Sequence, residues 1–416
     1  MQVCQRCLYT EHHPLHLTFD EEGICSGCRV HEEKDRLDWQ DRKNKLRKIL
    51  EQYRCRSGNN YDCIIPVSGA RDSYFIVHTI KQLLGMNPLL VAYNKQYNTA
   101  VGVRNLANLR NRFDCDIMTQ TLNPESVKKI TRSTFRRFGS IYWHCLAGQT
   151  VYPVQVAIKF KIPLIIWGAH QGVDQVGMFS HLNEVEMTRK YRKEHDLMGY
   201  EAEDLINKFD DVQEADIAAF VYPDNRELEQ VGVRGIYLNN FIRWDTRTQH
   251  EQMIRKYAYE TATQNRTFDT YNDVDCWNYS DVHDYLKHIK HGYGKVVDHA
   301  CREIRLKHMN RDEGIKLART YQSRPMKNLN LFLDWLGITE NAFHLVADQH
   351  RSPSFWERNK KWKWQPIVKW KKRFQSSQCL NEIKSRKKAF LNFLTTTKKI
   401  STDPTQKYVL IGKGFS

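Results

Sequence analysis

The regular alternation of short apolar runs with helix-length segments between residues 61 and 176 limits the folds open to this chain more than any other feature. The apolar runs read CIIPV, PLLVAY, DIMTQTL and IPLIIWGAH, and most are rich in isoleucine, valine or leucine. Runs of this kind, spaced by helical intervals, are typical of βαβ units whose strands pair in parallel. The sequence therefore predicts an α/β fold built on a doubly wound parallel sheet.

The first apolar run leads directly into a loop of small and polar residues, SGARDS at 68–73, and then into a helical pattern. A small-residue turn between strand and helix directs backbone N–H groups and the positive helix end toward one place, which suits a pyrophosphate. The hydroxyls of Ser68 and Ser73 can donate to phosphate oxygens, and Asp72 can act through a bridging Mg²⁺. By itself, the loop is equally compatible with an ordinary turn whose Ser and Asp cap the helix.

Four cysteines near the amino end form two closely spaced pairs, Cys4-x-x-Cys7 and Cys25-x-x-Cys28, with 17 residues between the pairs. This spacing is typical of a four-thiolate zinc site, in which each turn presents two sulfurs to one tetrahedral ion. Zinc binding would supply folding free energy that so short a segment cannot obtain from burial. We expect a structural site, because four thiolates leave no open position for a catalytic water.

The net charge of +16 is concentrated at the carboxyl end. Residues 351–416 hold 17 Lys and Arg against three acidic residues, which leaves 47 basic and 45 acidic residues for residues 1–350. The body is therefore nearly neutral, and we expect it to bind no nucleic acid. The tail is a candidate contact for a membrane surface, RNA or an acidic partner, and is equally compatible with a solvated extension.

Changes in composition along the chain predict five parts. These are a four-cysteine zinc-binding unit at 1–39, a helical linker at 40–60, the α/β domain at 61–176, a mainly α-helical region at 177–350 that completes the site, and a basic, tryptophan-rich tail at 351–416. Within the helical region, EVEMTRKYRKEHDLMGYEAEDLI has the character of one long charged amphipathic stretch. No run approaches the roughly 18 apolar residues of a membrane span, and MQVCQRCLYT lacks the features of a secretory signal, so we expect a cytoplasmic protein.

The loop SGARDS resembles the SGGxDS signature of the PP-loop ATP pyrophosphatases, with Ala70 where that family has its second glycine. Longer segments resemble the N-acetyl sugar amidotransferases, which serve bacterial surface-polysaccharide and flagellin-glycan synthesis, from about Cys4 to Trp356. The clearest strings are CQRCLYTEHHPLHLTFDEEGICSGCRVHEEKD, WHCLAGQTVYPVQVAIKFKIPLIIWGAHQGVDQVGMFSHLNEVEMTRKYRKEHDLMGYE, RTFDTYNDVDCWNYSDVHDY and GYGKVVDHACREIR.

This resemblance implies an adenine nucleotide alpha hydrolase-like fold and an amidotransferase in lipopolysaccharide and O-antigen synthesis. Such an enzyme would convert ATP to AMP and pyrophosphate, adenylate the N-acetyl oxygen of a nucleotide-activated sugar, and replace that oxygen with ammonia-derived nitrogen to give an acetamidino group. ATP, Mg²⁺ and structural Zn²⁺ would be its cofactors. It further implies that separate glutaminase and cyclase-like subunits deliver ammonia.

The family pattern and the ends of the predicted strands together indicate the site residues. Asp72 and Ser73 would be catalytic. Ligands of open α/β sheets bind at the carboxyl ends of the strands. On that basis the residues expected to bind ATP are Ser68, Gly69, Ala70, Asp72, Ser73, Tyr93, Asn94, Gly168, Ala169, His170 and Gln171. For Asn94 a turn-forming role, and for His170 a structural role, remains open.

Cations on a predicted helix in the carboxyl half are candidates to bind the nucleotide diphosphate of the substrate. They are Lys295, His299, Arg302 and Arg305, and a solvated helix face is an equally good interpretation of them. Three further residues of the longest family-like string can be assigned no step; these are Glu184, Glu186 and Arg189.

Two other functions remain open from the sequence. A tRNA-thiolating PP-loop enzyme would also combine zinc-binding cysteines with this loop and would use further cysteines, for which Cys145 and Cys276 are available. If the protein is a non-catalytic scaffold, Ala70 marks a degenerate loop and the basic tail is the functional segment.

Overall fold

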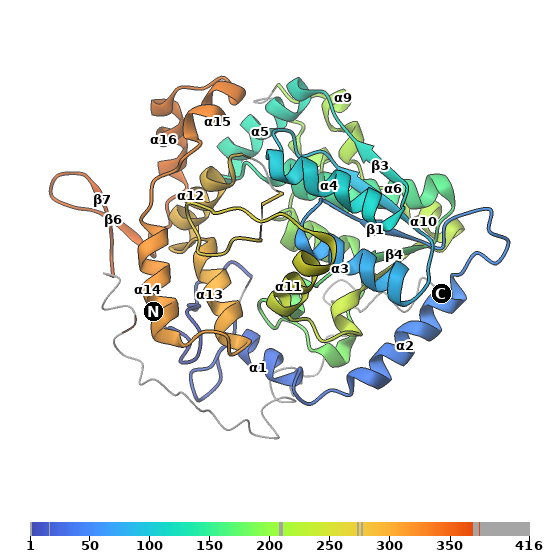
Figure 1. The fold of residues 1–416 in the computed structure, drawn as a ribbon. Coiled ribbons are helices and arrows are strands. Elements are labelled where there is room, and N and C mark those ends of the chain that lie inside the picture. The colour runs from blue at the N-terminus through green and yellow to red at the C-terminus, as the bar shows by residue number, and fades with distance from the viewer. Residues whose placement is uncertain are drawn as a thin grey trace, which may run out of the picture.

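A five-stranded parallel sheet in the order β3-β2-β1-β4-β5 forms the centre of the molecule (Figure 1). The computed structural model describes residues 2–15, 17–207, 211–272, 274–275, 278–368 and 374. The strands are β1 (Cys63–Pro66), β2 (Pro88–Tyr93), β3 (Ile117–Gln120), β4 (Leu164–Trp167) and β5 (Arg234–Tyr237). The strand order changes direction between β1 and β4, the position at which open parallel sheets receive ligands. The predicted α/β fold with a doubly wound parallel sheet is confirmed.

Helices cover both faces of the sheet because successive side chains of each buried strand point to opposite sides. In β1, Cys63 and Ile65 pack into one apolar cluster, whereas Ile64 packs into another on the opposite face. The first cluster contains residues of α2 (Trp39–Gln52), α3 (Arg71–Val77), α4 (Ala100–Phe113) and α11 (Thr246–Tyr257). The second contains residues of α6 (Trp143–Phe160) and α10 (Asn225–Val231).

Strand β5 lies within the region for which the sequence predicts helices. It pairs with β4 from Leu164↔Arg234 to Trp167↔Tyr237. The four residues RGIY include an arginine and a glycine, so they lack the apolar run that identifies the other strands. The sheet therefore extends beyond the predicted 61–176 domain.

The segment predicted as one long charged stretch is divided into short pieces. Its helical parts are α8 (Arg189–Tyr191), a π-helical turn at Arg192–Asp196 and a 3-10 turn at Glu203–Leu205. Met198 and Gly199 both have positive φ values, 56° and 88°, which no continuous right-handed helix tolerates. Charge periodicity alone did not reveal this break.

The amino-terminal four-cysteine unit shares its core with the carboxyl-terminal helices. Leu8, Tyr9 and Ile24 are buried in one cluster with residues of α13 (Lys295–Arg305) and α14 (Arg311–Gln322), and Figure 1 places the amino end beside these helices. The sequence predicted a unit held together without a core of its own. The structure instead supplies that core from a segment almost 300 residues further along the chain.

Three further helices of the carboxyl half pack against α5 (Pro124–Phe138) in a separate apolar cluster, which confirms the helical character of this region. None of the helices in the described part of the chain combines the length and apolar character needed to cross a bilayer. Of the predicted tail, residues 369–373 and 375–416 lie outside the described residues. The other elements are α1 (Ser26–Glu33), α7 (Gln171–Asp174), α9 (Glu214–Ile217), α12 (Ser280–His291), α15 (Leu329–Leu336), α16 (Glu340–Gln349), and the hairpin strands β6 (Trp356–Arg358) and β7 (Trp364–Pro366).

Candidate functional site

The loop between β1 and α3 has the geometry of a phosphate-binding turn. Gly69 has φ +81°, and a Cβ at this position would lie 2.9 Å from the backbone nitrogen of Leu106. Ala70 has φ −75° and ψ 168°, a conformation that alanine adopts without strain. The backbone N–H of Ser68 donates to Ser73 Oγ at 3.1 Å, and that of Ala70 donates to Ser68 Oγ at 3.3 Å. The loop therefore needs glycine at position 69, the first glycine position of the SGGxDS signature, and tolerates alanine at position 70, the second.

A cavity of about 340 Å³ opens beside this loop, at the carboxyl ends of β1 and β2 and along α4. Its size falls within the range of about 300–1,000 Å³ typical of small-molecule sites. Asn94 lines the cavity, and its Oδ1 also accepts hydrogen bonds from the Gln96 N–H and from Asn98 Nδ2, each at 3.0 Å. Asn94 thus shapes the turn after β2 as well as facing the cavity.

Tyr93 also lines this cavity, but its ring has partners elsewhere. The ring leaves no room for a side chain at Gly148, and its hydroxyl lies 3.1 Å from His144 Nδ1. Contacts from Tyr93 to a bound nucleotide would therefore come mainly from its backbone.

Charged residues surround Asp72 at the point where the strand order changes direction. Burial raises the pKa of Asp72; Arg71 and Arg302 oppose this rise, and Asp174 and Asp275 add to it. The side chain nevertheless keeps 37% of its surface exposed, so the carboxylate lies in an open recess of the protein. Such a carboxylate suits a divalent cation, since the ion would offset the neighbouring negative charges.

Ion pairs connect this recess to other parts of the chain. Arg71 Nε lies 3.1 Å from Asp72 Oδ1, and Lys95 Nζ lies 3.5 Å from Asp275 Oδ2. Lys34 of the amino-terminal unit pairs with Asp174, the last residue of the short helix α7 that follows β4. Sequence reasoning did not select Lys34, Lys95, Asp174, Asp269 or Asp275. The available signal was that all of these except Lys95 fall within the long family-like strings.

The contacts of His170 favour the structural role over nucleotide binding. Its side chain is buried, its Nδ1 accepts a hydrogen bond from the Gly172 N–H at 3.0 Å, and its ring centroid lies 4.2 Å from that of Tyr191. Burial lowers its pKa to about 3, so the ring is neutral at physiological pH. Gly168 packs near Ile76 of α3, Ala169 is half-buried, and Gln171 is exposed at the start of α7.

Three of the predicted substrate-binding cations on α13 hold a single loop, residues 264–269, which follows α11. Lys295 Nζ donates to Gln264 Oε1 at 2.8 Å, and His299 Nδ1 lies 2.7 Å from Thr267 Oγ1. Arg302 Nη2 donates to Asp269 Oδ2 at 2.7 Å. Burial would raise the pKa of Asp269, but His299 and Arg302 hold it well below its usual range. These cations are therefore engaged within the protein and do not form an open cationic patch.

The four cysteines of the amino-terminal unit come together as the spacing predicts. Their sulfurs are buried and lie within 4.8 Å of one another, with Cys4–Cys28 at 3.9 Å and Cys7–Cys25 at 3.7 Å. A tetrahedral ion with Zn–S bonds of about 2.3 Å requires sulfur separations of about 3.8 Å. The donor set and its spacing fit a structural zinc ion.

Arg305, the fourth predicted cation of α13, lies against this sulfur cluster. Its Nε lies 3.4 Å from Cys28 Sγ and its Nη2 lies 3.5 Å from Cys25 Sγ, while its Nη1 donates to the Gln175 carbonyl. Ser26 Oγ donates to the Val176 carbonyl at 2.7 Å in the same loop. Arg305 therefore offsets thiolate charge and ties the cysteine unit to the segment after β4, away from the phosphate loop.

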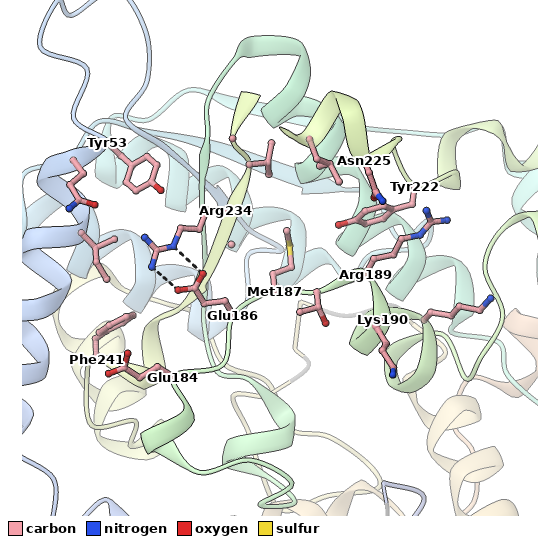
Figure 2. A pocket seen from close by; sticks show the side chains of 18 of the residues that line it. Tyr53, Glu184, Glu186, Met187, Arg189, Lys190, Tyr222, Asn225, Arg234 and Phe241 are labelled. Atoms are coloured by element: carbon pink, nitrogen blue, oxygen red, sulfur yellow. Dashed lines mark hydrogen bonds and ion pairs between the residues drawn. The ribbon is translucent and has the colours of Figure 1, made fainter. Parts of the chain in front are cut away.

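Glu184, Glu186 and Arg189 all line a larger cavity of about 950 Å³ beside the edge strand β5 (Figure 2). Arg234 of β5 donates to both carboxylate oxygens of Glu186, at 3.0 and 2.7 Å, on the cavity floor. Glu184 pairs with Lys45 of α2. These glutamates thus fasten the 184–189 segment to the sheet edge and to α2, which is a structural role that the sequence did not reveal.

A segment in the carboxyl half of the chain matches a known protein family. Residues 251–369 match the family described as "LPS biosynthesis protein WbpG-like, C-terminal domain". The matched segment runs from the middle of α11 to just past β7, and therefore includes α13 and the loop that α13 holds.

Two further similarities cover other lengths. The uncharacterized protein MJ1599 of Methanocaldococcus jannaschii is 25% identical over 118 residues, which is 28% of this chain and 41% of that protein. The chain thus spans about two fifths of the length of this relative. NMN synthetase from Francisella tularensis is similar in structure over 55% of this chain and 98% of its own, with 12% identity and a TM-score of 0.26.

Proposed function

We propose that this protein is an ATP-dependent N-acetyl sugar amidotransferase of bacterial lipopolysaccharide synthesis. The observation that carries the proposal is the β1–α3 loop, where Gly69 adopts φ +81° next to a nucleotide-sized cavity at the carboxyl ends of β1 and β2. The match of residues 251–369 to a family of lipopolysaccharide biosynthesis supports the biosynthetic setting. The resemblance of the longer sequence strings supports the specific chemistry.

Adenylation would overcome the two obstacles to converting an acetamide into an amidine. The amide carbonyl is a weak electrophile because nitrogen donates electron density into it, and its oxygen is a poor leaving group. Attack of that oxygen on the α-phosphorus of ATP forms an O–P bond and releases pyrophosphate, and the amide nitrogen loses its proton. Ammonia then adds to the imidate carbon, and the C–O bond breaks to release AMP and leave the acetamidino group.

The residues of the loop would position the phosphates, since positioning and charge stabilisation account for most of the catalysis of phosphoryl and adenylyl transfer. The N–H groups of Ser68, Ala70 and Ser73 hold the loop together, and the backbone N–H groups of Gly69, Arg71 and Asp72 would face the pyrophosphate. Asp72 would hold Mg²⁺, which when bound offsets the charge of the leaving pyrophosphate. Ser73 keeps Ser68 in place through the hydrogen bond between them.

The nitrogen would come from partner proteins. Ammonia is mostly protonated at neutral pH, so a coupled source protects the reactive form. We propose separate glutaminase and cyclase-like subunits as that source, as the family resemblance implies.

The direct test is incubation of the protein with Mg²⁺-ATP, ammonium chloride and a UDP-linked diacetamido sugar. Formation of AMP together with a one-mass-unit decrease of the sugar is expected, because NH replaces O. Asp72→Asn should lower the rate by about 10²–10³, the usual effect of removing a group that stabilises transition-state charge. Asp312→Asn, at an exposed position of α14, is the matched control and should leave the rate unchanged. ATP consumption without any change in sugar mass would contradict the proposal.

The two alternative functions make different demands on the protein. A scaffold would bind no ATP at millimolar concentration, which titration with Mg²⁺-ATP measures. The unstrained conformation of Ala70 argues against the degenerate loop that this alternative assumes. A thiolating enzyme needs accessible cysteines, whereas Cys145 is fully buried beside His144. Cys276 lies outside the described residues.

A further inference from the structure

A cavity of about 470 Å³ adjoins the one at the phosphate loop and is the second of this pair. It is bounded by the start of α4, by the loop that α13 holds, and by the turn between α14 and α15. Eleven of its thirteen lining residues lie within 251–369, the segment that matches the lipopolysaccharide biosynthesis family. This cavity is therefore built mainly by the family-specific part of the chain.

The lining of this cavity is dominated by neutral groups that form hydrogen bonds. Hydroxyls and amides both donate and accept, which suits a ligand with several hydroxyl and acetamido groups. Two cations, Arg324 and Lys327, stand at the same cavity and suit a phosphate group. The neutral polar residues are Thr99, Thr263, Gln264, Asn265, Asn278, Ser280 and Asn328.

Internal hydrogen bonds hold the wall of this cavity in place before any ligand binds. Asn265 Nδ2 donates to the Pro325 carbonyl at 2.6 Å, and Asn328 Nδ2 donates to the Asn278 carbonyl at 2.5 Å. Asp281 accepts a hydrogen bond from the Lys327 N–H at 3.2 Å. A wall fixed in this way lowers the entropic cost of binding.

The two cavities share one thin wall. Asn98 lines the cavity at the phosphate loop, and the next residue, Thr99, lines the second cavity. Likewise, Asp275 and Gly102 line the cavity at the phosphate loop, and the residues just before them, Val274 and Val101, line the second cavity. Thr99 Oγ1 joins the two chain segments that form this wall by donating to the Val274 carbonyl at 2.5 Å. A ligand in the second cavity would thus be a direct neighbour of a nucleotide at the loop.

We propose that this second cavity binds the nucleotide-linked sugar, with its hydroxyl and acetamido groups on the Asn- and Thr-lined wall and its phosphate near Lys327 and Arg324. The inference rests on the proposed function and adds to it the place of the second substrate. It also explains the role of α13, whose Lys295, His299 and Arg302 hold the loop that forms one side of the cavity.

The test is isothermal titration of the full-length protein with UDP-N-acetylglucosamine, with CMP-N-acetylneuraminic acid and, separately, with Mg²⁺-ATP. Lys327→Ala should weaken binding of the nucleotide sugar about tenfold, because an exposed lysine contributes a modest charge-assisted contact. ATP affinity should stay unchanged, and Lys327→Arg should recover most of the loss. Lys316→Ala removes an equally exposed lysine of the same family-matched segment outside the cavity, and should have no effect.

The result separates the inference from the proposed function. Equal affinity of Lys327→Ala and the unaltered protein for the nucleotide sugar would overturn the inference, even if AMP and the acetamidino product form. Binding of neither nucleotide sugar would overturn it as well. Binding that depends on Lys327, without conversion of a diacetamido sugar, would uphold the site and contradict the reaction.

Discussion

Gly69→Ala should damage the phosphate loop more than its size suggests. The left-handed backbone at φ +81° costs a residue with a Cβ about 1–2 kcal/mol. The added methyl would also stand 2.9 Å from Leu106 N and 3.0 Å from Leu106 Cβ, and real Cβ atoms do not approach backbone so closely. Because Leu106 N belongs to the middle of α4, the loop has to move instead of the helix.

A shift of the loop would turn the N–H group of Gly69 away from the phosphate position. We expect a loss of about 2–3 kcal/mol in the free energy of unfolding, which combines the backbone cost with partial relief of the contact. ATP affinity should fall by at least about tenfold, since about 1.4 kcal/mol of lost binding free energy corresponds to that factor. Urea unfolding and titration with Mg²⁺-ATP measure the two effects separately.

Ala70→Gly is the matched control. Ala70 has φ −75° at the N-cap of α3, where glycine is a better residue than alanine but adds backbone entropy to the unfolded chain. These effects nearly cancel, so stability should change by less than about 0.5 kcal/mol, and ATP affinity should be retained. An equal response of both variants, or an unchanged Gly69→Ala protein, would refute the assignment of the loop.

Other perturbations reach further parts of the molecule. Chelation of the four-cysteine centre should release one zinc per chain, measured by metal analysis, and should lower the Tm; a metal-free protein with an unchanged Tm would contradict the site. Glu186→Ala leaves Arg234 without its carboxylate and should cost about 3–5 kcal/mol in urea unfolding. Lys45→Ala, which removes an exposed ion pair, should cost no more than about 1 kcal/mol. Burial depresses the folded-state pKa of His170 to about 3, below its unfolded value of about 6.5. Its contribution to stability is therefore complete above pH 6.5 and is lost as the pH falls toward 3, so His170→Asn should reduce the slope of unfolding free energy against pH in this interval.

The sequence predicted those parts of the fold in which local pattern and tertiary structure agree. Strands β1, β2 and β4 carry apolar runs because both faces of the sheet are covered there, whereas the edge strand β3 reads IMTQ and is only partly buried. Cys4, Cys7, Cys25 and Cys28 carry their own spacing signal. Strand β5 carries neither signal, since Arg234 and Gly235 owe their extended conformation to β4 and to the partner Glu186. Such a strand is defined by its neighbours in space.

The candidate site divides in the same way. The phosphate loop was visible because strand, turn and helix are consecutive in the chain. The partners of α13 were not, because a cationic helix face looks the same in sequence whether it meets solvent, a ligand or a loop 30 residues away. His299 and Arg302 meet Thr267 and Asp269, and Arg305 meets the cysteines.

The contact between the first and last parts of the folded chain has a consequence for biosynthesis. The Leu8 N–H donates to Cys301 Sγ across 293 positions, and Arg311 donates to the Cys4 carbonyl across 307. At a synthesis rate of about 5–20 residues per second, roughly 15–60 s pass between the emergence of the cysteines and that of the helices that cover them. During this interval the apolar side of the amino-terminal unit faces solvent or chaperones, and early metal loading is what would keep its turns formed. A chain that stops before α13 should therefore aggregate through its amino terminus, although every cysteine of the metal centre is present.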